Sequence, residues 1–349
     1  MTLAPRVLAE CGATAPIVQA PMAGAGGVQL AIGAIRGGGV GSLPCAMLGP
    51  QAIVEQAAAV RAAVSGALNL NFFCHTLPAP PDETAWRALL TPYYTAEGVE
   101  PGASPALRRP FDADACATVE QVRPAIVSFH FGLPEPALLD RVRATGARIF
   151  GNATTPDEMR WLADHGADAV IAQGAEAGGH AGWFLAEAHT PVPLAELLAT
   201  PLAVPVIAAG GIVDAADIAA ALRQGADAVQ IGTAYLATPE SLISDPYRAL
   251  LGTHASGDAA FTTLFSGREA RGIRNRLMHD LGPDRREVPP FPYASAALAP
   301  LRAHAEAGGR TDYSPLWAGA GAPRVRPESA ETLTRRLATE TAALLSEPV

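Results

Sequence analysis

The sequence contains no lysine, and this is its sharpest absence. All 25 basic residues among the 349 are arginine. Schiff-base aldolases, pyridoxal-phosphate enzymes and P-loop nucleotide hydrolases depend on a lysine side chain, so the sequence excludes these three classes. A G-x-S-x-G motif is also missing, so nothing indicates the nucleophile elbow of an α/β-hydrolase.

Cysteine is scarce and scattered. Cys11, Cys45, Cys74 and Cys116 form no C-x-x-C pair and no cluster with histidine, which predicts neither a disulfide framework nor a metal site. The formal net charge is −9 and no basic run occurs, which argues against nucleic acid as a partner. No apolar run reaches the roughly 18 residues of a membrane-spanning helix, and the N-terminal residues show no signal-peptide pattern. We therefore expect a cytoplasmic protein that binds neither nucleic acid nor membrane.

Short apolar runs bounded by Gly, Pro or Asn alternate with amphipathic segments along the chain. Most are continuously apolar, as is typical of parallel strands buried on both faces. Thr155 and Asp214 are expected to cap two of the intervening helices, which Gly166 and Gly225 end. This alternation predicts an α/β fold, a (β/α)8 TIM barrel, with a doubly wound open sheet as the alternative. The predicted strands are 16–22, 38–44, 67–73, 125–131, 148–154, 169–174, 205–211 and 228–235.

Two segments do not fit the strand–helix repeat. Residues 74–124 form a proline-rich insertion after the third strand, and residues 240–326 follow the eighth. Both are expected to lie over the C-terminal face of the barrel, where barrel active sites occur. The predicted organisation is a barrel core over 1–239 that contains the insertion, a substrate-side extension over 240–326, and a C-terminal helix over 327–349 that packs on the barrel.

The most distinctive segment is Gln173–Gly182, which follows the sixth predicted strand. Its four glycines in ten residues let the backbone turn sharply and approach a ligand closely. His180 lies among them, and histidine is suited to proton transfer near neutral pH. The loop therefore predicts a place where a planar ligand meets a base. His130, at the end of the fourth strand, is as consistent with packing as with function.

Glycines end the seventh and eighth strands, where barrels often bind phosphate through backbone N–H groups. Gly210–Gly211 follow one strand, and Gly232 with the hydroxyl of Thr233 follows the other, so a phosphate site is favoured over simple tight turns. Asn71 and Gln173 end two other strands and are candidates to bond a heterocycle. These features predict metal-free redox chemistry on a phosphate-anchored flat cofactor.

Together these motifs resemble the nitronate monooxygenase family, formerly called 2-nitropropane dioxygenases. The resemblance runs from about residue 14 to 320, and 128–134 with Leu316–Gly319 point to its class I members. It implies an FMN-dependent barrel that uses O2 to oxidise nitronates, and in some members nitroalkanes, to a carbonyl compound and nitrite. His180 would be the catalytic base and His130 a second active-site histidine. The residues expected to bind FMN are Ala20, Pro21, Met22, Asn71, Gln173, Gly178, Gly179, Gly210, Gly211, Gln230, Ile231, Gly232 and Thr233, with no metal ligand.

Two other functions stay open. The glycine-rich loop with its histidine is also similar to that of FMN-dependent enoyl-acyl-carrier-protein reductases, so an NAD(P)H-dependent enoyl or quinone reductase is the first alternative. A flavin-binding protein without turnover is the second. Ala320 stands where class I members usually have glutamine, which bears on the substrate more than on the cofactor. The expected partners are a small nitronate or nitroalkane and O2, and the expected state is a monomer or homodimer.

Overall fold

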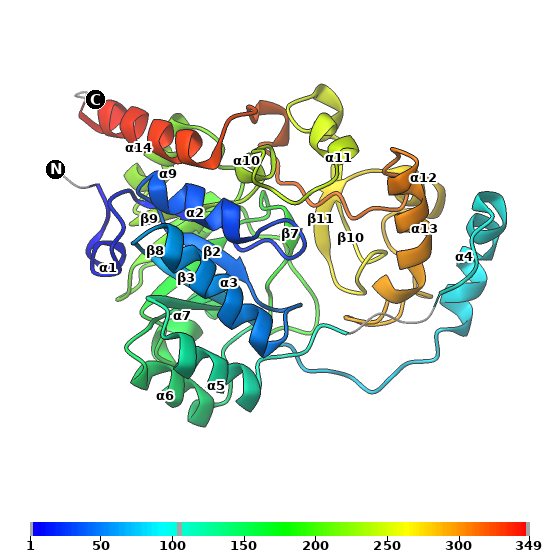
Figure 1. Cartoon of the computed structure of the whole chain (residues 1–349), viewed down its shortest axis with the longest axis horizontal. Helices are drawn as coiled ribbons and strands as arrows, with labels where there is room; N and C mark the ends of the chain where they lie inside the picture. The colour runs from blue at the N-terminus through cyan, green and yellow to red at the C-terminus, as the bar shows by residue number, and fades with distance from the viewer. Residues whose placement is uncertain (1–2, 103–106, 347–349) are drawn as a thin grey trace.

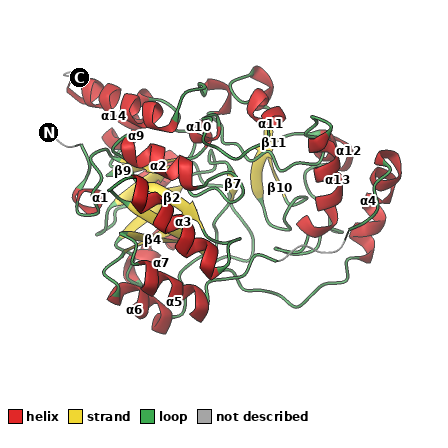
Figure 2. Cartoon of the chain, in the orientation of Figure 1, coloured by secondary structure: helices red, strands yellow, loops and turns green. Residues whose placement is uncertain are grey.

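The structure is a computed structural model that describes residues 3–102 and 107–346. Three short pieces of the predicted parts lie outside the described residues: 1–2 of the core, 103–106 of the insertion and 347–349 of the C-terminal helix. Eight parallel strands form a nearly closed barrel surrounded by helices (Figures 1 and 2). The (β/α)8 prediction is confirmed, and the open doubly wound sheet was wrong. The barrel strands are β1 (Ile17–Gln19), β2 (Gly41–Pro44), β3 (Leu68–Phe73), β4 (Ile126–His130), β5 (Arg148–Ala153), β6 (Ala169–Gln173), β8 (Val206–Ala209) and β9 (Ala228–Ile231).

The sheet closes through its first strand. β1 pairs in parallel with β9 on one side, and Val18 bridges to Val40, just before β2, on the other. Buried apolar side chains of the strands pack together with Val7 and Leu8 of α1 (Arg6–Ala9). The barrel interior is therefore a filled core.

Helices cover the outside of the barrel, and the last helix of the chain completes the ring. α14 (Ala330–Ser346) packs against both α2 (Val28–Arg36) and α9 (Ala215–Arg223). A Cβ added at Gly37, next to α2, would lie 2.3 Å from Thr334 Cβ, so this close approach requires glycine. The other ring helices are α2 (Val28–Arg36), α3 (Pro50–Ala63), α5 (Ala113–Val122), α6 (Pro136–Ala144), α7 (Pro156–Asp164), α8 (Leu194–Leu198) and α9 (Ala215–Arg223).

The two predicted caps are present. The Thr155 hydroxyl accepts a hydrogen bond from the Glu158 N–H at 3.2 Å. The Asp214 carboxylate accepts from the Asp217 N–H at 3.0 Å, and the Asp217 carboxylate accepts from the Asp214 N–H at 3.3 Å. Each cap satisfies an N–H group of the first helical turn and stabilises the helix by roughly 1 kcal/mol. The caps thus determine where α7 and α9 begin after their strands.

The eighth predicted strand, 228–235, is shorter than expected. β9 ends at Ile231, and α10 (Thr233–Leu236) begins directly after Gly232. A short apolar run fits a buried helix as well as a buried strand, because periodicity does not separate them. Thr233 therefore lies in the first turn of a helix.

A small antiparallel sheet joins the extension over 240–326 to the glycine-rich loop, Gln173–Gly182. β10 (Ala259–Thr262) pairs with β11 (Ala270–Ile273), and β11 pairs with β7 (Gly179–His180). The backbone of His180 thus pairs with that of Ala270, which lies far along the chain. Whether 1–239, 240–326 and 327–349 behave as separate parts stays a prediction.

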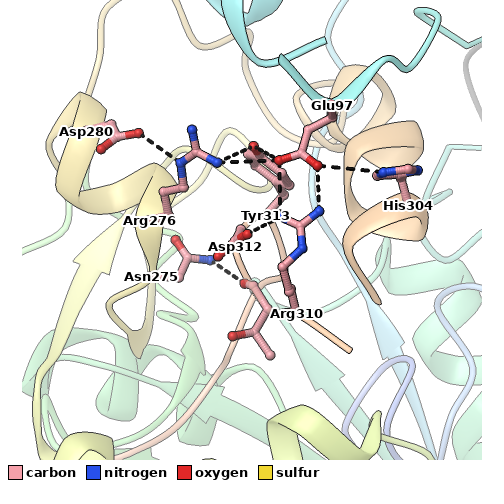
Figure 3. Close-up of polar contacts among 9 residues, drawn as sticks. Glu97, Asn275, Arg276, Asp280, His304, Arg310, Asp312 and Tyr313 are labelled. Atoms are coloured by element: carbon pink, nitrogen blue, oxygen red, sulfur yellow. Dashed lines mark hydrogen bonds and ion pairs between the residues drawn. The ribbon is translucent and has the colours of Figure 1, made fainter. Parts of the chain in front are cut away.

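The insertion over 74–124 and the extension over 240–326 contact each other beside the barrel. Helix α4 (Thr84–Glu97) of the insertion packs on α13 (Ser295–Ala307) (Figure 1). Glu97 at the end of α4 accepts hydrogen bonds from Arg310 and from the Tyr313 hydroxyl, the latter at 2.8 Å (Figure 3). These bonds and the positive charge of Arg310 lower the pKa of Glu97 to about 2, so the contact persists over the whole neutral range. The remaining helices are α4 (Thr84–Glu97), α11 (Asp245–Leu250), α12 (Arg276–Leu281) and α13 (Ser295–Ala307).

Within residues 3–102 and 107–346, no helix is long and apolar enough to cross a membrane. The same residues contain no group of three or more His, Cys, Asp or Glu side chains that could hold a metal ion.

Candidate functional site

A cavity of about 390 Å³ lies at the C-terminal ends of the barrel strands. The carboxyl ends of parallel barrel strands converge on one face, which explains why residues distant in sequence meet there. Of the predicted site residues, Ile231 alone is not part of the lining, because its side chain is buried in the core. The residues that do line the cavity are Ala20, Pro21, Met22, Asn71, His130, Gln173, Gly178, Gly179, His180, Gly210, Gly211, Gln230, Gly232 and Thr233. Their chemical roles stay predictions.

Gln173, at the end of β6, holds the loop that carries His180. Its Nε2 donates to the His180 carbonyl at 2.8 Å. Its Oε1 accepts from the Gly182 N–H at 3.0 Å and from Asn152 Nδ2 at 2.9 Å. The amide therefore bridges two points of the loop and restricts the path of the backbone at His180.

The His180 side chain lies in an aromatic environment at the cavity wall. Burial is the main cause that holds the pKa of His180 well below its usual range, and the nearby positive charge of Arg108 acts in the same direction. The imidazole is therefore neutral at pH 7 and has a lone pair available. The ring centroids that lie 5.4–6.4 Å from that of His180 are those of Phe73, Phe131, Phe291 and Trp317.

Two further histidines lie close by and are neutral as well. Burial lowers the pKa of His130 to about 3, with a smaller effect from the Arg268 charge. Burial also lowers the pKa of His75 to about 4. His75 is 6% exposed and packs edge-on against Phe291, with ring centroids 4.8 Å apart. His130 lines the cavity whereas His75 supports the wall behind it.

Two arginines supply positive charge to this region. Arg108 lines the cavity, and no carboxylate of the described residues forms an ion pair with it. Burial lowers the pKa of Arg108, and the positive charge of Arg302 acts in the same direction. The Arg268 guanidinium lies over the Trp183 ring at 4.0 Å and over the Phe131 ring at 4.3 Å. Sequence reasoning missed both, because single arginines in irregular segments carry no periodic signal.

The glycines of the cavity wall are required by the backbone path. Gly210 and Gly211 have φ of +127° and +72°, which side-chain-bearing residues rarely adopt. A Cβ at Gly178 would lie 2.5 Å from the Gly319 nitrogen. The Gly319 N–H donates in turn to Thr233 Oγ1 at 3.0 Å, so the segment after Trp317 packs directly on the glycine-rich loop and on the start of α10.

Comparison with known proteins agrees with this arrangement. The family model for nitronate monooxygenase matches residues 6–340. The chain is 38% identical to nitronate monooxygenase of Pseudomonas aeruginosa over 343 residues, covering 94% of this chain and 97% of that protein. It is also 38% identical to nitronate monooxygenase of Paraburkholderia phytofirmans over 341 residues, covering 94% and 93% respectively.

Solved structures show the same likeness. Nitroalkane oxidase from Streptomyces ansochromogenes matches with a TM-score of 0.90 at 33% identity, covering 97% of this chain and 99% of that chain. FabK from Thermotoga maritima matches with a TM-score of 0.70 at 23% identity, covering 97% and 95%, which is a likeness of fold alone. The chain belongs to the nitronate monooxygenase family of oxidoreductases.

Proposed function

We propose that this protein is an FMN-dependent enzyme that uses O2 to oxidise alkyl nitronates, and nitroalkanes as well, to a carbonyl compound and nitrite. The observation that carries the proposal is the neutral His180 at the wall of a cavity that is also lined by glycine backbone and by Arg108, which forms no ion pair with a carboxylate of the described residues. The similarity to nitronate monooxygenases and to a nitroalkane oxidase supports the same substrate class.

The cavity fits a flat, phosphate-bearing cofactor such as FMN. Gln230 Oε1 is buried and has no hydrogen-bond partner among the described residues, so it can accept from a ring N–H group. Gly210–Gly211 and Gly232 leave backbone accessible at the expected phosphate position. The Thr233 oxygen already accepts from Gly319, which leaves its hydroxyl proton free for a phosphate oxygen. When bound, FMN would accept electrons from the substrate and pass them on to O2.

His180 would act on the acidic proton of the substrate. A nitroalkane must lose its α-proton before it can be oxidised, and a neutral imidazole is the group that can take it. A nitronate has already lost that proton, so with this substrate His180 orients and bonds the anion. The two substrates therefore make different demands on the same side chain.

Arg108 would attract the anionic substrate. Arg108 lines the cavity and has no carboxylate partner among the described residues. A charge-assisted hydrogen bond from such a group contributes roughly 1.5–3 kcal/mol. Arg108 can therefore stabilise both a nitronate and the negative charge that develops as a nitroalkane is deprotonated.

The direct test is nitrite release under air from a panel of nitronates and nitroalkanes, without NADH, after the bound flavin has been extracted and identified. His180→Asn should lower nitroalkane turnover by about 10²–10⁴-fold, the usual contribution of general base catalysis, and spare nitronate turnover. His254→Asn, at an exposed histidine, is the matched control.

Three outcomes would contradict the proposal. Equal losses on both substrates in His180→Asn would refute its role as a base. Anaerobic flavin reduction by NADH or NADPH without nitrite release would indicate a reductase. A flavin-loaded protein that turns over none of these substrates would indicate a binding protein.

A further inference from the structure

Ser266 makes the one side-chain hydrogen bond to the His180 ring among the described residues. Its Oγ lies 2.9 Å from His180 Nε2. Ser266 is 1% exposed, so water cannot replace this contact. The residue lies in the turn between β10 and β11, 86 positions after His180. The His180 ring is thus bonded from the extension over 240–326, whereas the barrel residue Gln173 bonds the His180 backbone carbonyl.

The protons of this contact can be assigned from the neighbouring groups. The Ser266 hydroxyl has one proton, and Oγ lies 3.0 Å from the Arg268 carbonyl oxygen, which can only accept. No other described group donates to that carbonyl. If the hydroxyl proton goes to the Arg268 carbonyl, Oγ can only accept from its other partners. It accepts from the Arg268 N–H at 3.4 Å, and its remaining lone pair faces His180, so Nε2 must carry a hydrogen and donate it. The opposite assignment would leave the carbonyl without a donor.

The backbone of His180 is held by the same turn. Ala270 pairs with His180 in the β11–β7 ladder, and the Ala181 N–H donates to the Glu269 carbonyl at 3.0 Å. The phenyl rings around the imidazole offer no hydrogen-bonding groups. Backbone and ring are therefore oriented together, and Nδ1 is the ring nitrogen without a hydrogen-bond partner among the described residues.

We propose that Ser266 is a positioning residue that holds neutral His180 in the Nε2–H tautomer, so that Nδ1 is the atom that takes the substrate proton. The base role rests on the proposed function, whereas the tautomer does not. In the proton transfer, the α-carbon–hydrogen bond of the nitroalkane breaks and its electron pair stays on the substrate, which becomes the nitronate. The proton binds Nδ1, and the resulting imidazolium keeps its Nε2–H bond to Ser266.

The tautomer can be measured without catalysis. Protein labelled with ¹⁵N-histidine and loaded with its cofactor should show a His180 ring with protonated Nε2 and unprotonated Nδ1 in long-range ¹H–¹⁵N spectra at pH 7. His180→Asn assigns the signal by its disappearance. Ser266→Ala should convert it to a mixture of tautomers, and Ser266→Thr, which keeps the hydroxyl, should preserve it. A native ring with Nδ1–H, or an unchanged ring in Ser266→Ala, would overturn the proposal.

Kinetics then test the consequence for turnover. Losing one hydrogen bond of roughly 1–1.5 kcal/mol predicts that Ser266→Ala lowers kcat/KM for a nitroalkane about tenfold more than for the matching nitronate. Ser266→Thr should restore the ratio. Equal losses on both substrates would show a merely structural role for Ser266 and refute the positioning role. If the native enzyme oxidises neither substrate, the proposed function fails, and the spectra still decide the tautomer.

Discussion

Glu158 offers the sharpest test of how the loop after His180 is held. Its carboxylate is 1% exposed and accepts four hydrogen bonds. Oε2 accepts from the backbone N–H and the hydroxyl of Thr154, at 2.7 and 2.8 Å. Oε1 accepts from the N–H groups of Phe184 and Leu185, at 2.6 and 3.3 Å. One buried carboxylate therefore joins the end of β5 to the loop that follows the candidate base.

The magnitude follows from what an amide can accept. In Glu158→Gln, an NH₂ group replaces one carboxylate oxygen. The substitution costs the least free energy if this NH₂ group faces Thr154. The Thr154 hydroxyl can rotate to accept from it, but the Thr154 N–H is then buried without an acceptor. A lost charge-assisted bond and one unsatisfied donor together cost about 3 kcal/mol. If the loop alone opens, its amide protons should exchange about 10² times faster.

Hydrogen exchange and urea denaturation check this prediction. Peptides that cover 183–189 should exchange faster in Glu158→Gln, and the free energy of unfolding should fall by no more than about 3 kcal/mol. Glu196→Gln, which removes the same charge at an exposed glutamate of α8, is the control. Unchanged exchange at 183–189 together with an unfolding free energy within about 0.5 kcal/mol of the native value would refute the reasoning.

Three further predictions concern the cavity and its wall. Gly178→Ala should abolish flavin retention and lower the thermal midpoint, because its Cβ would lie 2.5 Å from backbone of Gly319; normal flavin content would contradict this. Arg108→Gln should raise KM for nitronates roughly 10–100-fold through loss of a charge-assisted bond, whereas Arg109→Gln, at an exposed neighbour, should not. Lowering the pH from 7 to 5 should destabilise the protein. His75 has a pKa of about 4 in the folded chain and stays unprotonated at pH 5, whereas in the unfolded chain the same side chain is protonated below about 6.5. His75→Gln should remove about 2 kcal/mol of that pH dependence, measured by urea denaturation at both pH values, and an unchanged dependence would count against burial of a neutral ring.

Local sequence signals were sufficient for the barrel. Apolar runs bounded by Gly, Pro or Asn identified each barrel strand. Thr155 and Asp214 marked the starts of α7 and α9 correctly, because a cap acts within one helical turn. One boundary that failed was the end of the predicted strand 228–235, where α10 begins at Thr233. There an apolar run continues from strand into helix without a change in periodicity.

Once a barrel is assumed, the sequence also predicts that the residues of the candidate site lie close together. Parallel strands bring their carboxyl ends to one face, so Asn71, Gln173 and Gln230 had to approach one another. Ile231 lies outside the cavity lining because alternate residues of a strand point to opposite faces, and its neighbour Gln230 takes the cavity side.

By itself, the sequence determined the strand–helix alternation, the glycine-rich loop with His180, and the exclusion of lysine-dependent chemistry. Each of these depends on residue types or on neighbours within a few positions. Only the tertiary structure decided what surrounds His180: the Ser266 hydroxyl at Nε2, the pairing with Ala270, and the aromatic rings. Those partners lie in irregular segments, whose positions result from packing between parts of the chain far apart in sequence, and no local pattern records such contacts.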